Sequence, residues 1–493
     1  MNVRWRVLSD VDQLIQVLPE DILESVEMSE DEEKSEVTFM RLPSELEWQR
    51  LAQYARRVRA LDCWELSFSF MNPSLELIME HFPYGQLFPN LHTLRSNSLL
   101  PSSLLLQSPL RHLKLKKIHS DHIEDIMDAL PGCASTLETI FMDRMTCGAD
   151  CQSEALSQKF SSALLKMEKL TRVYVSLSFP RAIQHLSTLS TLRELSLNDF
   201  TAVETATLLF PAMTHLMVWV QLVNIPALLP YLKNLEAPVL QELSIYPQVD
   251  FSSLRNPANH RRPLAADLHV ILHEISHLST LQSFAFDVNW FPFASPVEDT
   301  HILDARMLAP LFSLRNLGTL RLSTLPVRLT LGDAEAMAHA WPQLHTLCIS
   351  DSASATPPTA TDRLLPVDAV LPFACLCPKL YSLRLPLQIA QAPLDVPLAH
   401  TFVAKDIDLG IVDIQAGVAD DVVRLLARLC RGVRVMGTKG DEQAEKALNK
   451  RIDKVRRAEQ AAARRGGEAG SGGETKWQLV RSFFGIVSRK VKA

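Results

Sequence analysis

The chain has 493 residues, of which 47% are apolar and 22% are charged, and its formal net charge is −6. This apolar fraction excludes a disordered polypeptide. The length is sufficient for several domain cores or for one long repetitive core.

The first residues and the cysteines both point to the inside of the cell. MNVRWRVLSDVDQ carries Arg and Asp where a secretory signal needs an apolar stretch. The eight cysteines are scattered, as expected for buried thiols in a reducing compartment. The closest of them lack a second ligand pair at zinc-site spacing. We therefore expect an intracellular protein, cytoplasmic or nuclear, without a metal centre or cofactor.

Three regions differ in composition. Residues 1–45 form an N-terminal segment whose acidic run, Glu30 to Glu33 with Glu36, is typical of a solvated loop. Residues 46–435 contain a repeated apolar pattern, and residues 436–493 form a basic tail. The tail includes a glycine-rich linker at 466–474.

One hexamer, apolar-x-x-apolar-x-apolar, returns through the central region, as in LRHLKL, LRELSL and LHTLCI. The average period is about 29 residues, at the upper edge of leucine-rich-repeat lengths. The first apolar positions of the copies are Leu91, Leu110, Leu137, Leu170, Leu192, Met213, Leu240, Leu281, Leu317, Leu344 and Leu380.

The hexamer predicts a short strand, because its apolar residues alternate with polar ones. Segments with helical spacing lie between copies: DHIEDIMDAL, EALSQKFSSALLKM, DLHVILHEISHL and GDAEAMAHAW. Strand, helix and parallel strand make a right-handed crossover. We therefore predict an α/β fold: an irregular leucine-rich-repeat solenoid, a horseshoe with a parallel concave sheet, convex helices and a helical C-terminal tail.

The stretch from Thr205 to Leu232 has no formal charge and is long enough to cross a bilayer. It contains three prolines, and its PAMTHLMV segment repeats the hexamer. We expect it to form part of the solenoid core.

HEISH at 273–277 matches the H-E-x-x-H signature of zinc peptidases. A helical wheel places Leu268, Ile271, Leu272, Ile275 and Leu278 on one arc and the histidines opposite, on the solvated side. A zinc peptidase therefore remains a distant alternative. The sequence has no Walker loop, G-x-S-x-G or G-x-G-x-x-G, and we expect no enzyme.

From Lys439 onward, 14 basic and 7 acidic residues give the tail a net charge of +7. AEKALNKRIDKVRRAEQAAARR is expected to be a largely solvated helix. The last stretch, KWQLVRSFFGIVSRKVKA, places apolar residues at helical spacing among basic ones. Such a helix can lie on an anionic membrane or cap the solenoid, and we favour the cap.

The order of segments resembles that of fungal F-box-like leucine-rich-repeat proteins. LPEDI and LPSEL are similar to the opening of an F-box, and the array closes with KDIDLGIVDI and a Trp-bearing tail. In that family a W-x-R-h-x-x-Y-A-x-R-V-R-x-L segment opens the array. Here it corresponds to Trp48, Arg50, Leu51, Tyr54, Ala55, Arg57, Val58, Arg59 and Leu61.

The resemblance implies a substrate-receptor-like subunit of a cullin-type ubiquitin ligase, with the ligase adaptor and cullin as partners. In this sequence the F-box is missing or degenerate, since it should lie upstream of about residue 10. The chain then either comes from a truncated gene model or has lost the adaptor contact. A free-standing leucine-rich-repeat scaffold or inhibitor is the alternative.

Whichever class holds, we expect a protein partner on the concave face. The residue inside each L-x-L strand points out of the core onto that face. A partner would set acidic groups against the basic members of this strip and insert an apolar group near the aromatic ones. The candidate residues are Arg95, Lys114, Phe141, Tyr174, Met217, Arg321 and Arg384. No nucleic-acid partner is expected, because no basic stripe interleaved with aromatics occurs within the array.

Overall fold

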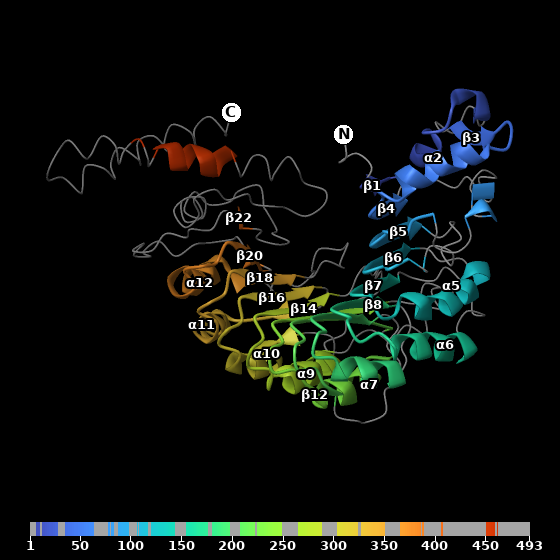
Figure 1. The fold of residues 1–493 in the computed structure, drawn as a ribbon. Coiled ribbons are helices and arrows are strands. Elements are labelled where there is room, and N and C mark those ends of the chain that lie inside the picture. The colour runs from blue at the N-terminus through green and yellow to red at the C-terminus, as the bar shows by residue number, and fades with distance from the viewer. Residues whose placement is uncertain are drawn as a thin grey trace, which may run out of the picture. The chain divides into compact units, whose positions relative to one another are not determined.

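A computed structural model describes residues 6–9, 12–27, 35–63, 77–78, 80–82, 87–97, 106, 108–116, 120–142, 154–175, 180–197, 208–221, 224–248, 265–287, 303–323, 327–350, 365–385, 387–388, 406–407, 450–458 and 461 (Figure 1). The chain divides into two compact units, Met1–Asn289 (unit 1) and Trp290–Ala493 (unit 2).

Unit 1 is built on a parallel sheet in which most neighbouring strands follow one another along the chain. Its strands are, in order, β1 (Val7–Leu8), β4 (Ala60–Cys63), β5 (Thr93–Asn97), β6 (His112–Lys116), β7 (Thr139–Met142), β8 (Arg172–Val175), β9 (Glu194–Leu197), β11 (His215–Gln221), β13 (Glu242–Gln248) and β14 (Ser283–Asp287). A short bridge, β10 (Leu208–Leu209) with β12 (Leu235–Glu236), lies outside this sheet. Because connections between parallel strands must cross over, helices alternate with strands.

Helices cover one face of the unit 1 sheet (Figure 1). They are α5 (Ser120–Cys133), α6 (Glu154–Leu164), α7 (Pro180–Thr188), α8 (Ile225–Lys233) and α9 (Ala265–Ile275). We call the opposite face, onto which the polar strand positions point, the open face. Within the described part of unit 1, the alternation of strand and helix is that of an α/β leucine-rich-repeat solenoid, as predicted.

The repeat predicted from the sequence is confirmed at all eleven positions. Each first apolar residue, from Leu91 to Leu380, has at most 1% of its surface exposed. Each lies two residues before a strand of the parallel sheet of its own unit. The four predicted helical segments correspond to α5, α6, α9 and, in unit 2, α11. The short helices α7 and α8 were not predicted.

One backbone joint recurs between successive repeats. A carbonyl just before each strand accepts hydrogen bonds from two consecutive N–H groups of the next repeat. Arg111 O, for example, accepts from Glu138 N at 2.8 Å and Thr139 N at 2.9 Å. The other acceptors in unit 1 are Arg6, Arg59, His92, Glu138, Thr171, Arg193, Thr214 and Gln241. The joint therefore holds neighbouring strands in the same register even though the segments between them differ in length.

Threonine hydroxyls add a second joint in three repeats. Thr136, Thr191 and Thr280 each precede the first apolar residue of a hexamer. Each donates to the carbonyl of the first apolar residue of the preceding repeat at 2.8 Å; the acceptors are Leu110, Leu170 and Leu240. The repeated S-T-L phrase thus has a structural function.

The structure adds two strands that the repeat alignment did not include, β1 and β4. VRALDC before and along β4 follows the hexamer pattern at Val58 and Leu61, which are both fully buried. β1 pairs with β4, so part of the predicted N-terminal segment belongs to the sheet. The predicted boundaries 1–45, 46–435 and 436–493 remain predictions.

The remaining N-terminal residues form α1 (Asp12–Ile15), a hairpin of β2 (Leu23–Glu27) and β3 (Ser35–Phe39), and α2 (Glu45–Ala55). Glu47 accepts hydrogen bonds from Ser44 N and Ser44 Oγ at the start of α2, and the adjacent Arg41 guanidinium binds it at 3.0 Å. These contacts lower the pKa of Glu47 to about 2, with the hydrogen bond from Arg41 as the main cause. The predicted acidic loop lies largely outside the described residues.

The charge-free stretch after Thr205 is divided among short elements, β10, β11 and most of α8. No helix in the described part of the chain is long and apolar enough to cross a membrane.

Unit 2 continues the same pattern in four parallel strands, β16 (Thr319–Ser323), β18 (Thr346–Ser350), β20 (Ser382–Arg384) and β22 (Asp406–Ile407). The helices are α10 (Ala305–Leu308), α11 (Leu331–Ala340) and α12 (Val370–Leu376). Unit 2 also contains two short parallel strand pairs. They are β15 (Leu303–Asp304) with β17 (Val327–Arg328), and β19 (Leu365–Pro366) with β21 (Leu387–Gln388). Trp341 is fully buried, and its Nε1 donates to Leu311 O at 3.0 Å.

In the tail, residues 450–458 are helical, as predicted. The helix is largely solvated except at Ile452 and Val455, which are buried. The final amphipathic stretch and the glycine-rich linker lie outside the described residues.

We predict that the double substitution T136V/T280V lowers the free energy of unfolding by about 2 kcal/mol. Each change removes one hydroxyl hydrogen bond worth about 1 kcal/mol, and sites this far apart contribute additively. Urea unfolding followed by circular dichroism measures the difference. T188V is the control, because Thr188 Oγ1 bonds a carbonyl of its own helix, His185 O, and not a neighbouring repeat. Equal losses in the double and control variants would contradict the role of the threonine joint.

Candidate functional site

The candidate site is the row of side chains at the centre of the open face, which we call the central row. In unit 1 the register places these residues directly opposite one another on successive strands: Asp62, Arg95, Lys114, Phe141, Tyr174, Ser196, Met217, Ser244 and Ala285. Neighbouring parallel strands are separated by about 4.8 Å, so adjacent members of the row can touch.

Three of the predicted site residues, Lys114, Phe141 and Tyr174, form a contact chain on β6 to β8, and Arg95 lies opposite Lys114 on β5. Lys114 Nζ lies 4.5 Å from the centroid of the Phe141 ring, a cation–π geometry. The Phe141 and Tyr174 rings are 5.4 Å apart between centroids, tilted by 42°. Arg95 forms an ion pair with Asp62 at 3.1 Å, which the sequence alignment did not reveal because it omitted β4. The contact chain thus has the basic Lys114 at one end, next to the aromatic rings of Phe141 and Tyr174.

Tyr174 is anchored by a carboxylate from the next strand. Its hydroxyl donates to Glu194 Oε2, while Arg172 Nε binds Glu194 Oε1 at 3.0 Å. Burial, and then the hydrogen bond to Glu194, raise the pKa of Tyr174 to about 12. The ring is therefore held in one orientation, with a neutral hydroxyl over the physiological pH range.

The middle of the central row is less accessible than predicted. Ser196 is 4% exposed and Ala285 is 7% exposed, so neighbouring side chains cover both positions. Met217 is half-buried and is separated from Tyr174 by the buried Ser196. The structure thus does not bring Met217 into the contact chain of Lys114, Phe141 and Tyr174.

A second aromatic pair on the open face was missed by the repeat alignment. Trp219 and Tyr246 face each other in register on β11 and β13, two residues beyond the central row. Their rings stack with centroids 4.4 Å apart and an interplanar angle of 20°. The sequence contains the pattern that predicts this pair, because the alternation of apolar and other residues continues past the hexamer in HLMVWVQ and ELSIYPQ.

Unit 2 carries the last two predicted residues on its own open face. Arg321, Cys348 and Arg384 lie opposite one another on β16, β18 and β20. Arg321 is exposed, whereas Arg384 and the free thiol of Cys348 are partly buried.

The HEISH segment has the arrangement that the helical wheel predicts. Leu268, Ile271, Leu272 and Ile275 are fully buried and Leu278 is 4% exposed, whereas His273 is exposed. Helix α9 ends at Ile275, so His277 lies beyond it, and its Nε2 is 3.2 Å from Leu235 O. Among the described residues, no group of three or more His, Cys, Asp or Glu is placed to hold a metal ion.

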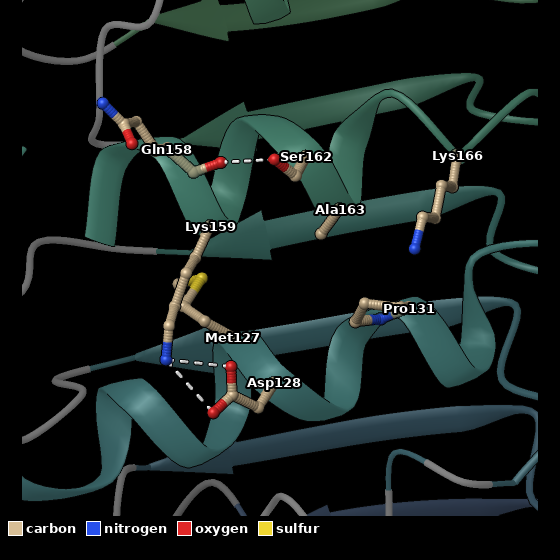
Figure 2. Close-up of a pocket in the computed structure, with 8 residues that line it drawn as sticks. All are labelled: Met127, Asp128, Pro131, Gln158, Lys159, Ser162, Ala163 and Lys166. Atoms are coloured by element: carbon tan, nitrogen blue, oxygen red, sulfur yellow. Dashed lines mark hydrogen bonds and ion pairs between the residues drawn. The ribbon is translucent and has the colours of Figure 1, made fainter. Parts of the chain in front are cut away.

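An open hollow of about 500 Å³ lies between α5 and α6 on the helix side (Figure 2). Met127 and Ala163 form its apolar floor, and Lys159 crosses it to form an ion pair with Asp128 at 3.0 Å. This ion pair raises the pKa of Lys159 through the hydrogen bond to Asp128. Because the pair joins two successive helices across the hollow, its plainest role is structural.

No protein-family model matches the sequence, and no curated protein matches it. Among solved structures, an internalin (InlF) from Listeria monocytogenes is similar with 14% sequence identity and a TM-score of 0.31. The alignment covers 61% of this chain and 75% of the internalin chain. The repeat register described above, and not this match, defines the fold of the chain.

We predict that Tyr174 loses its proton near pH 12, about two units above the ordinary tyrosine value of about 10. The raised pKa means that its contribution to stability is fully present below pH 10 and is lost as the pH rises through 12. A 13Cζ-tyrosine NMR titration measures the midpoint, with the resonance assigned by its absence in Y174F.

E194Q provides the matched test of the cause. Removing the carboxylate charge should lower the Tyr174 midpoint while leaving it above 10, since the burial remains. A midpoint near 10 in the unaltered protein would show that the Tyr174 hydroxyl is neither buried nor bonded to Glu194.

Proposed function

We propose that the protein recognises a partner protein through the open face of its leucine-rich-repeat solenoid. The observation that supports this most strongly is the contact chain Lys114–Phe141–Tyr174, held in place by Glu194 and flanked by Arg95. Its members come from different repeats, and both rings are partly exposed. Aromatic and arginine side chains of this kind dominate the energetics of protein interfaces.

The arrangement favours a partner that combines an acidic group with an apolar one. Arg95 and Lys114 supply positive charge, while Phe141 and Tyr174 supply a preorganised apolar surface beside it. Because the rings already pack against each other, little side-chain entropy is lost on binding. Met217 extends the proposed contact area within unit 1, and we propose Arg321 and Arg384 as partner contacts on the open face of unit 2.

At a finer level, we propose that this recognition serves a cullin-type ubiquitin ligase, with the chain as a substrate-receptor-like subunit. The proposal rests on the sequence resemblance to F-box-like leucine-rich-repeat proteins. The segment that carries the resemblance forms α2 and β4, and its Trp48 stacks on His81 at 4.4 Å between centroids. The free thiols of the described cysteines are compatible with a reducing, intracellular compartment.

Affinity purification of the tagged chain from cells that express it, followed by mass spectrometry, separates the two levels of the proposal. Recovery of a cullin and its adaptor would support the ligase role, and the other abundant proteins would be candidate substrates. Recovery of a different partner without them would favour a free-standing scaffold or inhibitor.

We predict that F141A/Y174A weakens binding of the recovered partner at least tenfold. Truncating two adjacent interface aromatics costs roughly 1.4 kcal/mol or more, which corresponds to that factor. Isothermal titration calorimetry with the purified partner measures it.

L165A/V270A is the control, since Leu165 and Val270 are exposed apolar side chains 47% and 38% accessible on the helix side of unit 1. If the aromatic and control variants bind the partner equally well, the open face of unit 1 is not the recognition surface.

A further inference from the structure

Charge is divided unevenly along the sheet of unit 1. From the first apolar position of each repeat to the end of its strand, β1, β4, β5 and β6 carry six Arg or Lys and one Asp. The next six strands carry two basic and four acidic residues by the same count. The six basic residues are Arg6, Arg59, Arg95, Arg111, Lys114 and Lys116. The first strands are thus net positive in a chain whose net charge is −6.

Part of this charge forms a second row at the entrance to the strands, which we call the entry row. It consists of Arg6, Arg59, His92 and Arg111, the residues whose carbonyls accept the paired N–H groups of the next repeat. The shared backbone joint places the four side chains on successive strands, about 4.8 Å apart. The entry row therefore spans about 14 Å along the edge of the sheet.

Contacts within the entry row hold its side chains in position. Arg59 Nη1 donates to His92 Nε2 at 2.9 Å, so this nitrogen accepts and the proton of the neutral ring lies on Nδ1. His92 Nδ1 is then the donor to Pro109 O at 3.4 Å. Arg111 Nη1 lies 3.6 Å from Glu138 Oε1. Glu138 is the corresponding residue of the next repeat, so the row of basic side chains ends there. Arg59 is exposed, and the Arg111 side chain is 58% exposed.

We propose that the entry row, with the basic half of the central row beside it, docks an acidic, extended segment of a partner protein. This inference rests on the proposed function and deepens it. Alternate residues of an extended chain point the same way and are about 6.7 Å apart. Three carboxylates at alternate positions thus span about 13 Å, close to the length of the entry row. Arginine binds such carboxylates through charge-assisted hydrogen bonds.

A protein segment fits these strands better than a nucleic acid does. Binding of single-stranded nucleic acid combines a basic groove with aromatic faces on which bases stack. The aromatic rings next to the basic strands are engaged already: Lys114 Nζ lies over Phe141, whose ring packs against Tyr174. The open aromatic pair of Trp219 and Tyr246 lies on β11 and β13, among the strands with more acidic than basic residues.

The test uses the full chain and a fluorescein-labelled peptide with glutamates at alternate positions, GETETETEG, measured by fluorescence anisotropy in 50 and 150 mM NaCl. We expect binding that weakens with salt. R59E/R111E should reduce the affinity at least tenfold. K166E/K169E, which changes the net charge by the same amount at exposed positions between α6 and β8, should reduce it less than twofold.

Two results would overturn the proposal: equal losses in the two charge-reversed variants, or tighter binding of an oligothymidylate of equal formal charge than of the peptide. If R59E/R111E lowers the melting temperature, R59Q/R111Q replaces it in the test. We expect R59Q/R111Q to reduce the affinity by a smaller factor than R59E/R111E, because it removes the positive charges without adding negative ones.

The same variants separate this inference from the proposed function when they are assayed with the partner recovered from cells. If F141A/Y174A weakens that partner and R59E/R111E does not, the entry row is not a docking surface and the open face remains the recognition surface. If neither variant weakens it, both proposals fail.

Discussion

The joint between repeats is the interaction on which the rest of the structure depends. No single strand of this chain can cover its own apolar side, so each first apolar residue is buried only when an equivalent strand stacks beside it. One carbonyl that accepts two N–H groups sets the spacing and register of that stack. The segments between joints can then vary in length without moving the strands relative to their neighbours.

Register at the joint also creates the candidate site. Lys114, Phe141 and Tyr174 come from three repeats separated by helices, yet the pairing of β6, β7 and β8 places them in contact. Glu194, from a fourth repeat, then binds the Tyr174 hydroxyl and Arg172 together. Since these contacts exist before any partner arrives, the surface is organised in advance, which limits the entropy lost on binding.

The same register explains why charge can accumulate along an edge. Side chains at one repeat position are neighbours across strands, so a few arginines at that position form a continuous row. In the entry row, the neutral His92 separates Arg59 from Arg111 and accepts a hydrogen bond from the first, which reduces the repulsion that three adjacent cations would cause. The charge of the unit 1 strands therefore changes along the sheet, from basic at the first strands to more acidic towards β14.

By itself, the sequence determined the repeating unit and the burial of its eleven first apolar residues. It also determined that Arg95, Lys114, Phe141 and Tyr174 point to the open face. Both follow from the two-residue alternation of a short strand, which is a local property of the sequence. The tertiary structure alone decided which of these side chains touch. It paired Arg95 with Asp62 on a strand that the alignment omitted, stacked Trp219 on Tyr246, and covered Ser196. Such neighbours depend on how strands from distant parts of the chain are stacked, and no local pattern carries that information.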